Sequence, residues 1–268
     1  MKRILFYSII GSLVLLNACQ KEYEIPAVTA PGITAVEITK SVDLTFSFTA
    51  EGGYKSSTLT ATGGTAVIKT DGNVGATSGS VIVTFTATRE TGAASLTITM
   101  TDNNNKIGQA VAVLDVEAFP TISVTDNISA NTTWETGIIY ILEGRITVLS
   151  GATLTIQPGV IVKGREGAEA NACCLMVARG GKLMAEGTST SPIIFTSIAD
   201  QIVPGEIASP NLQPTINGLW GGVIILGKAP ISADNDVMGI EGIPPSDLNA
   251  QYGGAEPTDN SGCRSSPR

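Results

Sequence analysis

The chain has 268 residues, of which 43% are hydrophobic, 5% aromatic and 15% charged, and it contains no histidine. This length is sufficient for one or two domains with a buried core. The formal net charge of −8 has the wrong sign for binding phosphate backbones, so we expect no nucleic-acid partner. Without histidine the chain has no Ser-His or Cys-His nucleophile pair and no imidazole ligand for zinc.

Residues 1–18 have the pattern of a secretory signal peptide. Lys2 and Arg3 precede an apolar run over 4–16, which is shorter than the about 18 residues of a spanning helix. The run leads into Leu-Asn-Ala and then Cys19, which resembles the lipobox of bacterial lipoproteins. The resemblance implies cleavage before Cys19 and fatty chains such as palmitate on that residue, which anchor the chain in the lipid bilayer. The alternative is an ordinary signal peptide followed by a cysteine by chance.

Residues 19–32 are expected to form an extended tether between the lipid and the folded chain, because they contain charges and two prolines. The acidic Glu22 and Glu24 resemble the surface-export signals of Bacteroidetes lipoproteins, although an ordinary solvated linker has a similar composition. We therefore expect anchoring at the cell outer membrane. Surface exposure and a periplasmic location both remain open.

Residues 33–118 alternate apolar and polar side chains with period two, as in 44–48, 81–86 and 96–100, and threonine is frequent. Glycine pairs and Asp/Asn clusters separate the runs. The pattern predicts about seven strands of about five to nine residues in an antiparallel β-sandwich. It resembles a bacterial immunoglobulin-like module without the Cys…Trp…Cys core of antibody domains. Such modules serve as spacers or as weak adhesive surfaces.

Residues 119–262 repeat short apolar strands between glycine corners, with insertions at 165–172 and 199–217. This pattern is typical of a right-handed parallel β-helix, in which successive coils stack about 4.8 Å apart. An antiparallel sandwich is the main alternative, but it predicts regular hairpins. The fold class that we expect is therefore all-β, with an immunoglobulin-like sandwich followed by a partial β-helix.

The segment from about 133 to 262 also resembles a recurring β-helix module of Bacteroidetes surface lipoproteins and secreted proteins. The resemblance rests on several phrases in order: 139–144, 151–159, 177–181, 184–188, 192–197, 218–222 and 259–262. The molecular role of this module is generally unassigned. Similar proteins continue with further coils, whereas residues 263–268 here are polar and have no strand pattern. We expect a truncated or frame-shifted product; the alternative is a short natural tail that caps the stack.

Cys173 and Cys174 are adjacent, so a disulfide between them would be strained. We expect one to face inward and one outward in small buried or edge positions, and a redox switch is the alternative. Asp234 and Asp236 offer oxygen ligands of the kind that Ca²⁺ prefers, but the rest of a cation loop is missing and ordinary loop acidity is the alternative. We expect no catalytic residue, metal or cofactor.

Three aromatic residues, Trp220, Tyr252 and Trp134, are candidate ligand contacts, because exposed aromatic rings stack on sugar faces. Buried packing at a coil corner is the alternative for each of them. The leading hypothesis is a non-enzymatic, lipid-anchored surface protein that adheres or contacts a polysaccharide or surface partner through the β-helix. The alternatives are a polysaccharide lyase or other glycan-active enzyme on the same scaffold, and a structural envelope component. A cluster of three or more carboxylates with Arg or Lys on one sheet would favour the enzyme.

Overall fold

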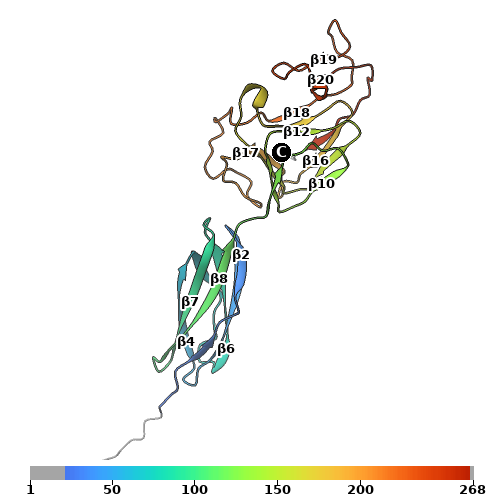
Figure 1. The fold of residues 1–268 in the computed structure, drawn as a ribbon. Helices are drawn as coiled ribbons and strands as arrows, with labels where there is room; N and C mark the ends of the chain where they lie inside the picture. Colours follow the sequence, from blue (N-terminus) through green and yellow to red (C-terminus); the bar gives the residue numbers. More distant parts are fainter. Residues whose placement is uncertain (1–21, 266–268) are drawn as a thin grey trace, which may run out of the picture. The chain divides into compact units, whose positions relative to one another are not determined.

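The computed structural model describes residues 22–265, which divide into two compact units between Glu117 and Ala118 (Figure 1). Both units consist of β-strands, with two short 3-10 helices in the second. The expected lipidation site, Cys19, lies outside the described residues. Among residues 22–265 no helix is long and apolar enough to cross a membrane.

The first unit contains two four-stranded sheets. One has the order β1-β3-β6-β5 and the other β2-β8-β7-β4. The strands of the first sheet are β1 (Ala27–Thr29), β3 (Ser41–Thr49), β5 (Gly64–Thr70) and β6 (Ser78–Ala87). Those of the second are β2 (Thr34–Glu37), β4 (Tyr54–Thr62), β7 (Gly92–Asp102) and β8 (Ile107–Glu117).

One hydrophobic core lies between these two sheets, because every second side chain of the long strands is buried. Phe46 of β3 and Phe85 of β6 meet Leu96 and Ile98 of β7 there, all fully buried. Burying each such side chain stabilises the fold by about 1.5–3 kcal/mol. The period-two pattern of the sequence therefore predicted the correct buried face.

Two details of this unit differ from the sequence expectation. Ala27–Thr29 pairs with β3, so the second half of the expected tether is part of a sheet. Residues 33–118 contain seven strands, β2 to β8, as expected, but β2 pairs with β8 in parallel rather than antiparallel, with Thr34 opposite Leu114. The parallel pair arises because the chain passes from β2 through Thr39 (φ 64°) into the other sheet instead of making a hairpin. The immunoglobulin-like assignment stays a prediction.

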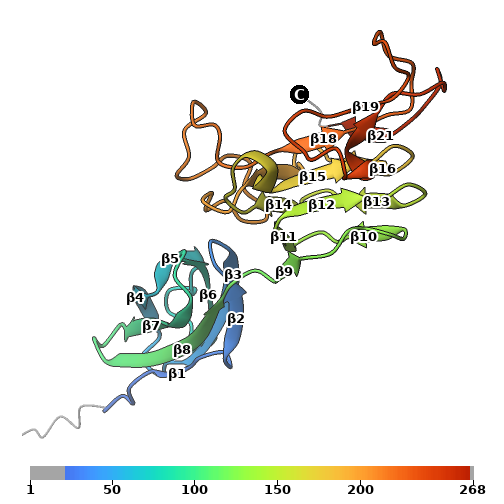
Figure 2. The ribbon, with the colours of Figure 1, turned by 45° about the horizontal axis from the view of Figure 1, so that its top comes forward.

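The second unit consists of three parallel sheets, to each of which every complete coil contributes one strand (Figure 2). The first sheet contains β9 (Thr121–Val124), β11 (Ile139–Leu142), β14 (Ile161–Gly164) and β17 (Ile194–Ser197). The second contains β12 (Arg145–Val148), β15 (Cys174–Val177) and β18 (Val223–Ile225). The third contains β10 (Thr132–Trp134), β13 (Thr153–Ile156), β16 (Lys182–Glu186) and β21 (Gly262–Ser265). This arrangement confirms the parallel β-helix and excludes the antiparallel alternative.

The interior of the β-helix is filled by aliphatic side chains stacked in register. Ile146 of β12 pairs with Leu175 of β15, and Leu154 of β13 with Leu183 of β16; each is at most 2% exposed. Glycines form a recurring corner: Gly151 (φ 85°) and Gly180 (φ 84°) follow β12 and β15, and Gly151 N donates to Gly180 O at 2.9 Å. The left-handed backbone at this corner favours glycine.

Three insertions leave the coils. Residues 165–172 carry the 3-10 helix η1 (Glu169–Asn171), and 199–217 separate β17 from β18. The third, which we name the 228–252 loop, contains β19 (Met238–Gly239), η2 (Leu248–Ala250) and β20 (Gln251–Tyr252). Its two ends meet, because Gly253 N donates to Gly227 O at 2.9 Å.

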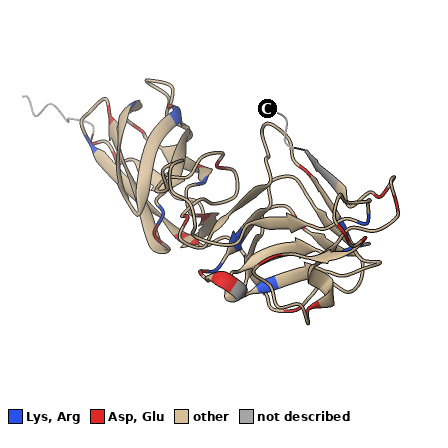
Figure 3. Ribbon diagram, turned by 90° about the horizontal axis from the view of Figure 1, so that it is seen from above, with Lys and Arg blue, Asp and Glu red and all other residues tan. Residues whose placement is uncertain are grey.

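The end of the described chain also differs from the expectation. The segment 263–268 was expected to lack strand character, but 263–265 belong to β21, which continues the third sheet beside β16. Residues 266–268 lie outside the described part. In each unit acidic and basic residues are interspersed along the ribbon (Figure 3).

Candidate functional site

A polar groove of about 550 Å³ lies on the second unit over the outer face of the β12 sheet. Arg145 and Thr147 face it because they alternate along β12 with the inward-facing Ile146 and Val148. The lining residues come from the first two coils, from the end of η1 and from the 228–252 loop. They are Asn127, Glu143, Gly144, Arg145, Thr147, Asn171, Asp247 and Asn249.

An ion pair joins β12 to the 228–252 loop across one side of the groove. Arg145 Nη2 lies 3.0 Å from Asp247 Oδ2, and each side chain is 24% exposed. The other carboxylate oxygen, Asp247 Oδ1, accepts the backbone N–H of Asn249 at 3.1 Å and so caps η2. Both oxygens of Asp247 are therefore engaged.

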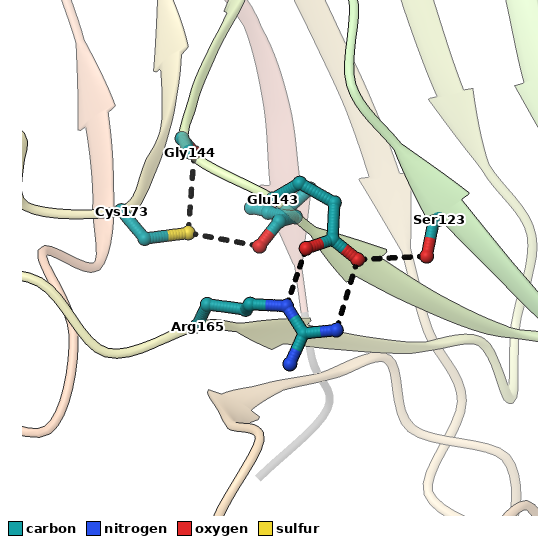
Figure 4. Close-up of polar contacts among 6 residues, drawn as sticks. Ser123, Glu143, Gly144, Arg165 and Cys173 are labelled. Carbon is teal, nitrogen blue, oxygen red and sulfur yellow. Dashed lines mark hydrogen bonds and ion pairs between the residues drawn. The ribbon is translucent and has the colours of Figure 1, made fainter.

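A second ion pair joins successive coils beside the groove (Figure 4). Arg165 donates from Nε and Nη2 to the two carboxylate oxygens of Glu143, the Nη2 contact being 3.1 Å. The Ser123 hydroxyl donates to Glu143 Oε1 at 2.7 Å. The hydrogen bond from Arg165, and then that from Ser123, lower the pKa of Glu143 below its ordinary value. At neutral pH Glu143 is therefore a carboxylate, which accepts protons poorly and has none to donate.

The adjacent cysteines face opposite sides of their sheet, as expected. Cys173 belongs to the inner core, and its thiol donates to the carbonyl oxygens of Leu142 and Gly144, each 3.1 Å away (Figure 4). Cys174 belongs to a second cluster beneath the 228–252 loop. Burial raises the pKa of Cys173, and it raises that of Cys174 to about 11. Both thiols are protonated at neutral pH, so they are poor nucleophiles.

The three aromatic candidates do not line this groove. Trp134 is 3% exposed and stacks on Tyr140 with ring centroids 4.5 Å apart. Trp220 is half-buried against the inner core, and its ring lies so close to Gly164 that a Cβ there would be 2.3 Å from Cε3. Tyr252 is half-buried in the cluster around Cys174. These positions correspond to the packing alternative, and we do not propose them as ligand contacts.

The acidic candidates Asp234 and Asp236 are exposed on the 228–252 loop, away from the groove lining. Within residues 22–265 there is no group of three or more His, Cys, Asp or Glu side chains that could hold a metal ion. The sequence patterns did not predict the groove residues Glu143 and Arg145. Polar residues at outward positions of an otherwise apolar strand are the signal that could have found Arg145.

Comparisons with known proteins identify the second unit. The sequence profile of a family described as a pectate-lyase like beta helix domain matches residues 126–265, which is more than half of the chain. No curated protein matches the chain significantly.

Several solved structures resemble parts of the chain at low TM-scores. The SrpA adhesin from Streptococcus sanguinis has 18% identity and a TM-score of 0.31, over 41% of this chain and 70% of that one. The GspB Siglec domain has 14% identity and a TM-score of 0.27, over 41% and 65%. The secreted serine protease VesC from Vibrio cholerae has 16% identity and a TM-score of 0.25, over 35% and 23%. We base no inference on these similarities.

Proposed function

The chain belongs to the pectate-lyase-like β-helix domain family, and on this basis we propose that it is a lipid-anchored surface protein whose β-helix binds saccharides without cleaving them. The binding site is the polar groove over β12. The anchor is the acylated Cys19 of the lipobox-like sequence. The first unit acts as a spacer between the two.

The observation that carries this proposal is the lining of the groove. The side-chain amides of Asn171 and Asn249 make no hydrogen bond within residues 22–265. Asn127 uses its Oδ1 for Thr147 N at 2.9 Å, which leaves its amide N–H groups to donate. An amide offers donors and acceptors together, as a sugar hydroxyl does. The groove therefore presents the groups that bind several neighbouring hydroxyls.

The same lining supports binding rather than catalysis. Proton transfer is most effective from a group whose pKa lies near the working pH. The pKa of Glu143 is lowered by Arg165, and both oxygens of Asp247 are already hydrogen-bonded or ion-paired. Glu143 is therefore not poised to take or give a proton, and the Asp247 oxygens are already engaged within the chain.

The family itself favours one alternative, a polysaccharide lyase on this scaffold. A lyase needs an arginine or lysine as base beside a group of carboxylates. The groove lining contains two carboxylates and Arg145, with Arg165 beside it, and each arginine is engaged by a carboxylate. We rank the lyase second for that reason.

The test is a glycan array probed with the full chain, followed by calorimetry on the retained saccharides. The same mixtures are assayed by ultraviolet absorbance for the unsaturated products of a lyase. We expect binding, no product, and loss of binding in N171A and N249A. Product formation would overturn the non-enzymatic proposal, and failure to retain any saccharide would overturn the binding proposal.

A further inference from the structure

Each arginine at the groove is engaged by a carboxylate of this chain. Arg165 is held by Glu143 in a two-pronged contact, and Glu143 is itself positioned by the Ser123 hydroxyl. Arg145 is paired with Asp247, and the backbone N–H of Asn249 in η2 donates to Asp247 and so orients its carboxylate. Such bidentate and doubly supported contacts are the stronger kind of ion pair.

The surroundings of Arg145 contain more acid than base. The groove lining includes two carboxylates, Glu143 and Asp247, and one guanidinium. A smaller cleft of about 160 Å³ is also lined by Arg145, together with Glu169 and Glu241 among mostly apolar residues. Together with Arg165, this part of the unit therefore holds two cations and four anions.

From this balance we infer that the groove selects uncharged saccharides and excludes acidic ones, and that Glu143 and Asp247 are the residues that determine this specificity. The inference rests on the proposed function of the same groove. The inference goes further than sugar binding, because it assigns the discrimination between neutral and acidic saccharides to two carboxylates that are paired with the arginines.

The physical reason is competition for the guanidinium groups. A uronate carboxylate that enters the groove must either displace Glu143 from Arg165 or Asp247 from Arg145, or remain unpaired beside them. Displacement leaves the chain's own carboxylate next to the ligand's, and like charges at short distance repel. A neutral sugar needs no displacement, since its hydroxyls bond to the amides and to the outer sides of the existing pairs.

The experiment compares two oligosaccharides of equal length, a galacturonan and the galactan made by reducing its carboxylates, which differ only at C6. Binding of each to the full chain is measured by calorimetry at low and high salt. The wild-type chain is expected to bind the galactan and not the galacturonan. In E143Q, Arg165 is released, and affinity for the galacturonan is expected to rise about tenfold and to fall again with salt.

D247N is the second variant, since it removes the Asp247 carboxylate from Arg145 and is expected to act in the same direction. E90Q is the matched control, because it removes the same charge from an exposed position of the first unit and should leave both affinities unchanged. Thermal melting of each variant establishes that it is folded.

Tight binding of the galacturonan to the wild type, unchanged in E143Q, would overturn the inference and leave the proposed function standing. If the chain binds neither oligosaccharide and no other neutral or acidic glycan, the inference and the proposed function are both overturned.

Discussion

Arg145 and Asp247 are 102 residues apart in the sequence, yet Arg145 Nη2 and Asp247 Oδ2 are 3.0 Å apart. The pair ties the second coil to the 228–252 loop, which also packs on an apolar patch that includes Cys174, Met176 and Ile224. The ends of this loop are closed by the bond between Gly253 N and Gly227 O. The ion pair and the small apolar cluster therefore both help to hold the wall of the groove that carries Asp247.

The first prediction concerns this wall. R145A is expected to loosen the 228–252 loop and expose Cys174, which lies beneath it at 2% exposure. Alkylation of the Cys174 thiol should become several-fold faster, while global stability falls by only about 0.2–1 kcal/mol, because the pair is partly exposed. Mass spectrometry of the labelled peptide measures the rate and separates Cys174 from Cys173 by fragmentation.

K69A serves as the control for that experiment. It breaks the Lys69–Asp43 pair of the first unit, whose side chains are 57% and 43% exposed. Alkylation of Cys174 should be unchanged in this variant. Equal labelling of Cys174 in R145A and the wild type would show that the apolar cluster alone holds the loop.

The second prediction concerns alkaline pH. Tyr54 is buried, its hydroxyl donates to the Asp71 carboxylate and lies 2.8 Å from the Ser57 hydroxyl, and burial raises its pKa from 10.0 to about 12. Because the folded pKa lies above the unfolded one, stability is complete below pH about 10 and is lost as pH rises toward about 12. Y54F removes this titration but also a hydrogen bond worth about 1 kcal/mol. Urea denaturation at neutral pH and at pH about 11 should therefore show a smaller alkaline loss in Y54F than in the wild type; equal losses would contradict the prediction.

The third prediction concerns the insertion over 199–217. Asp200 is 5% exposed, and its carboxylate accepts from the Thr196 hydroxyl, the Ser209 hydroxyl and Ile202 N at 2.7–2.9 Å. D200A leaves these donors without their acceptor and should cost about 1–3 kcal/mol. Proteolysis within 199–217 and chemical denaturation measure the effect. D234A, at an exposed position, should change neither, and an equal loss in both variants would refute the role of Asp200.

Local patterning in the sequence predicted most of the fold. Alternation over 44–48 and 81–86 places Phe46 and Phe85 in one core, and the glycine corners at Gly151 and Gly180 mark the coils. Both are local effects, since side-chain direction and backbone freedom depend on neighbouring residues. The parallel pairing of β2 with β8 was missed because it depends on which sheet the chain enters after Thr39.

The groove could not be predicted in the same way. Its two ion pairs connect residues of different coils, and the number of residues between them depends on the insertions. The sequence predicted aromatic residues as ligand contacts because the ability to stack on sugars depends on the residue type alone. Their burial is decided by packing, as the stacking of Trp134 on Tyr140 illustrates.

The fourth prediction concerns the anchor at Cys19, which the sequence alone supports. C19S should prevent acylation and move the protein from the membrane fraction to the soluble fraction, because no fatty chain then enters the bilayer. Mass spectrometry of the natural product should find a cleaved amino terminus with acyl chains on Cys19. C173S is the control, since its buried thiol has no part in anchoring. An uncleaved, unmodified amino terminus in the wild type would exclude the anchor.

The fifth prediction separates backbone strain from loss of space at the coil corners. Gly151 has φ 85° and Gly144 has no positive φ, and an added Cβ would meet nothing within 4 Å at either position. G151A should therefore destabilise the chain by about 1–2 kcal/mol through the left-handed backbone alone, and G144A should be nearly neutral. Chemical denaturation of both variants measures the difference. Equal stabilities of G151A and G144A would mean that the corner at Gly151 relaxes out of the left-handed region. The hydrogen bond from Gly151 N to Gly180 O would then be lost as well, and faster hydrogen exchange at that amide would detect the loss.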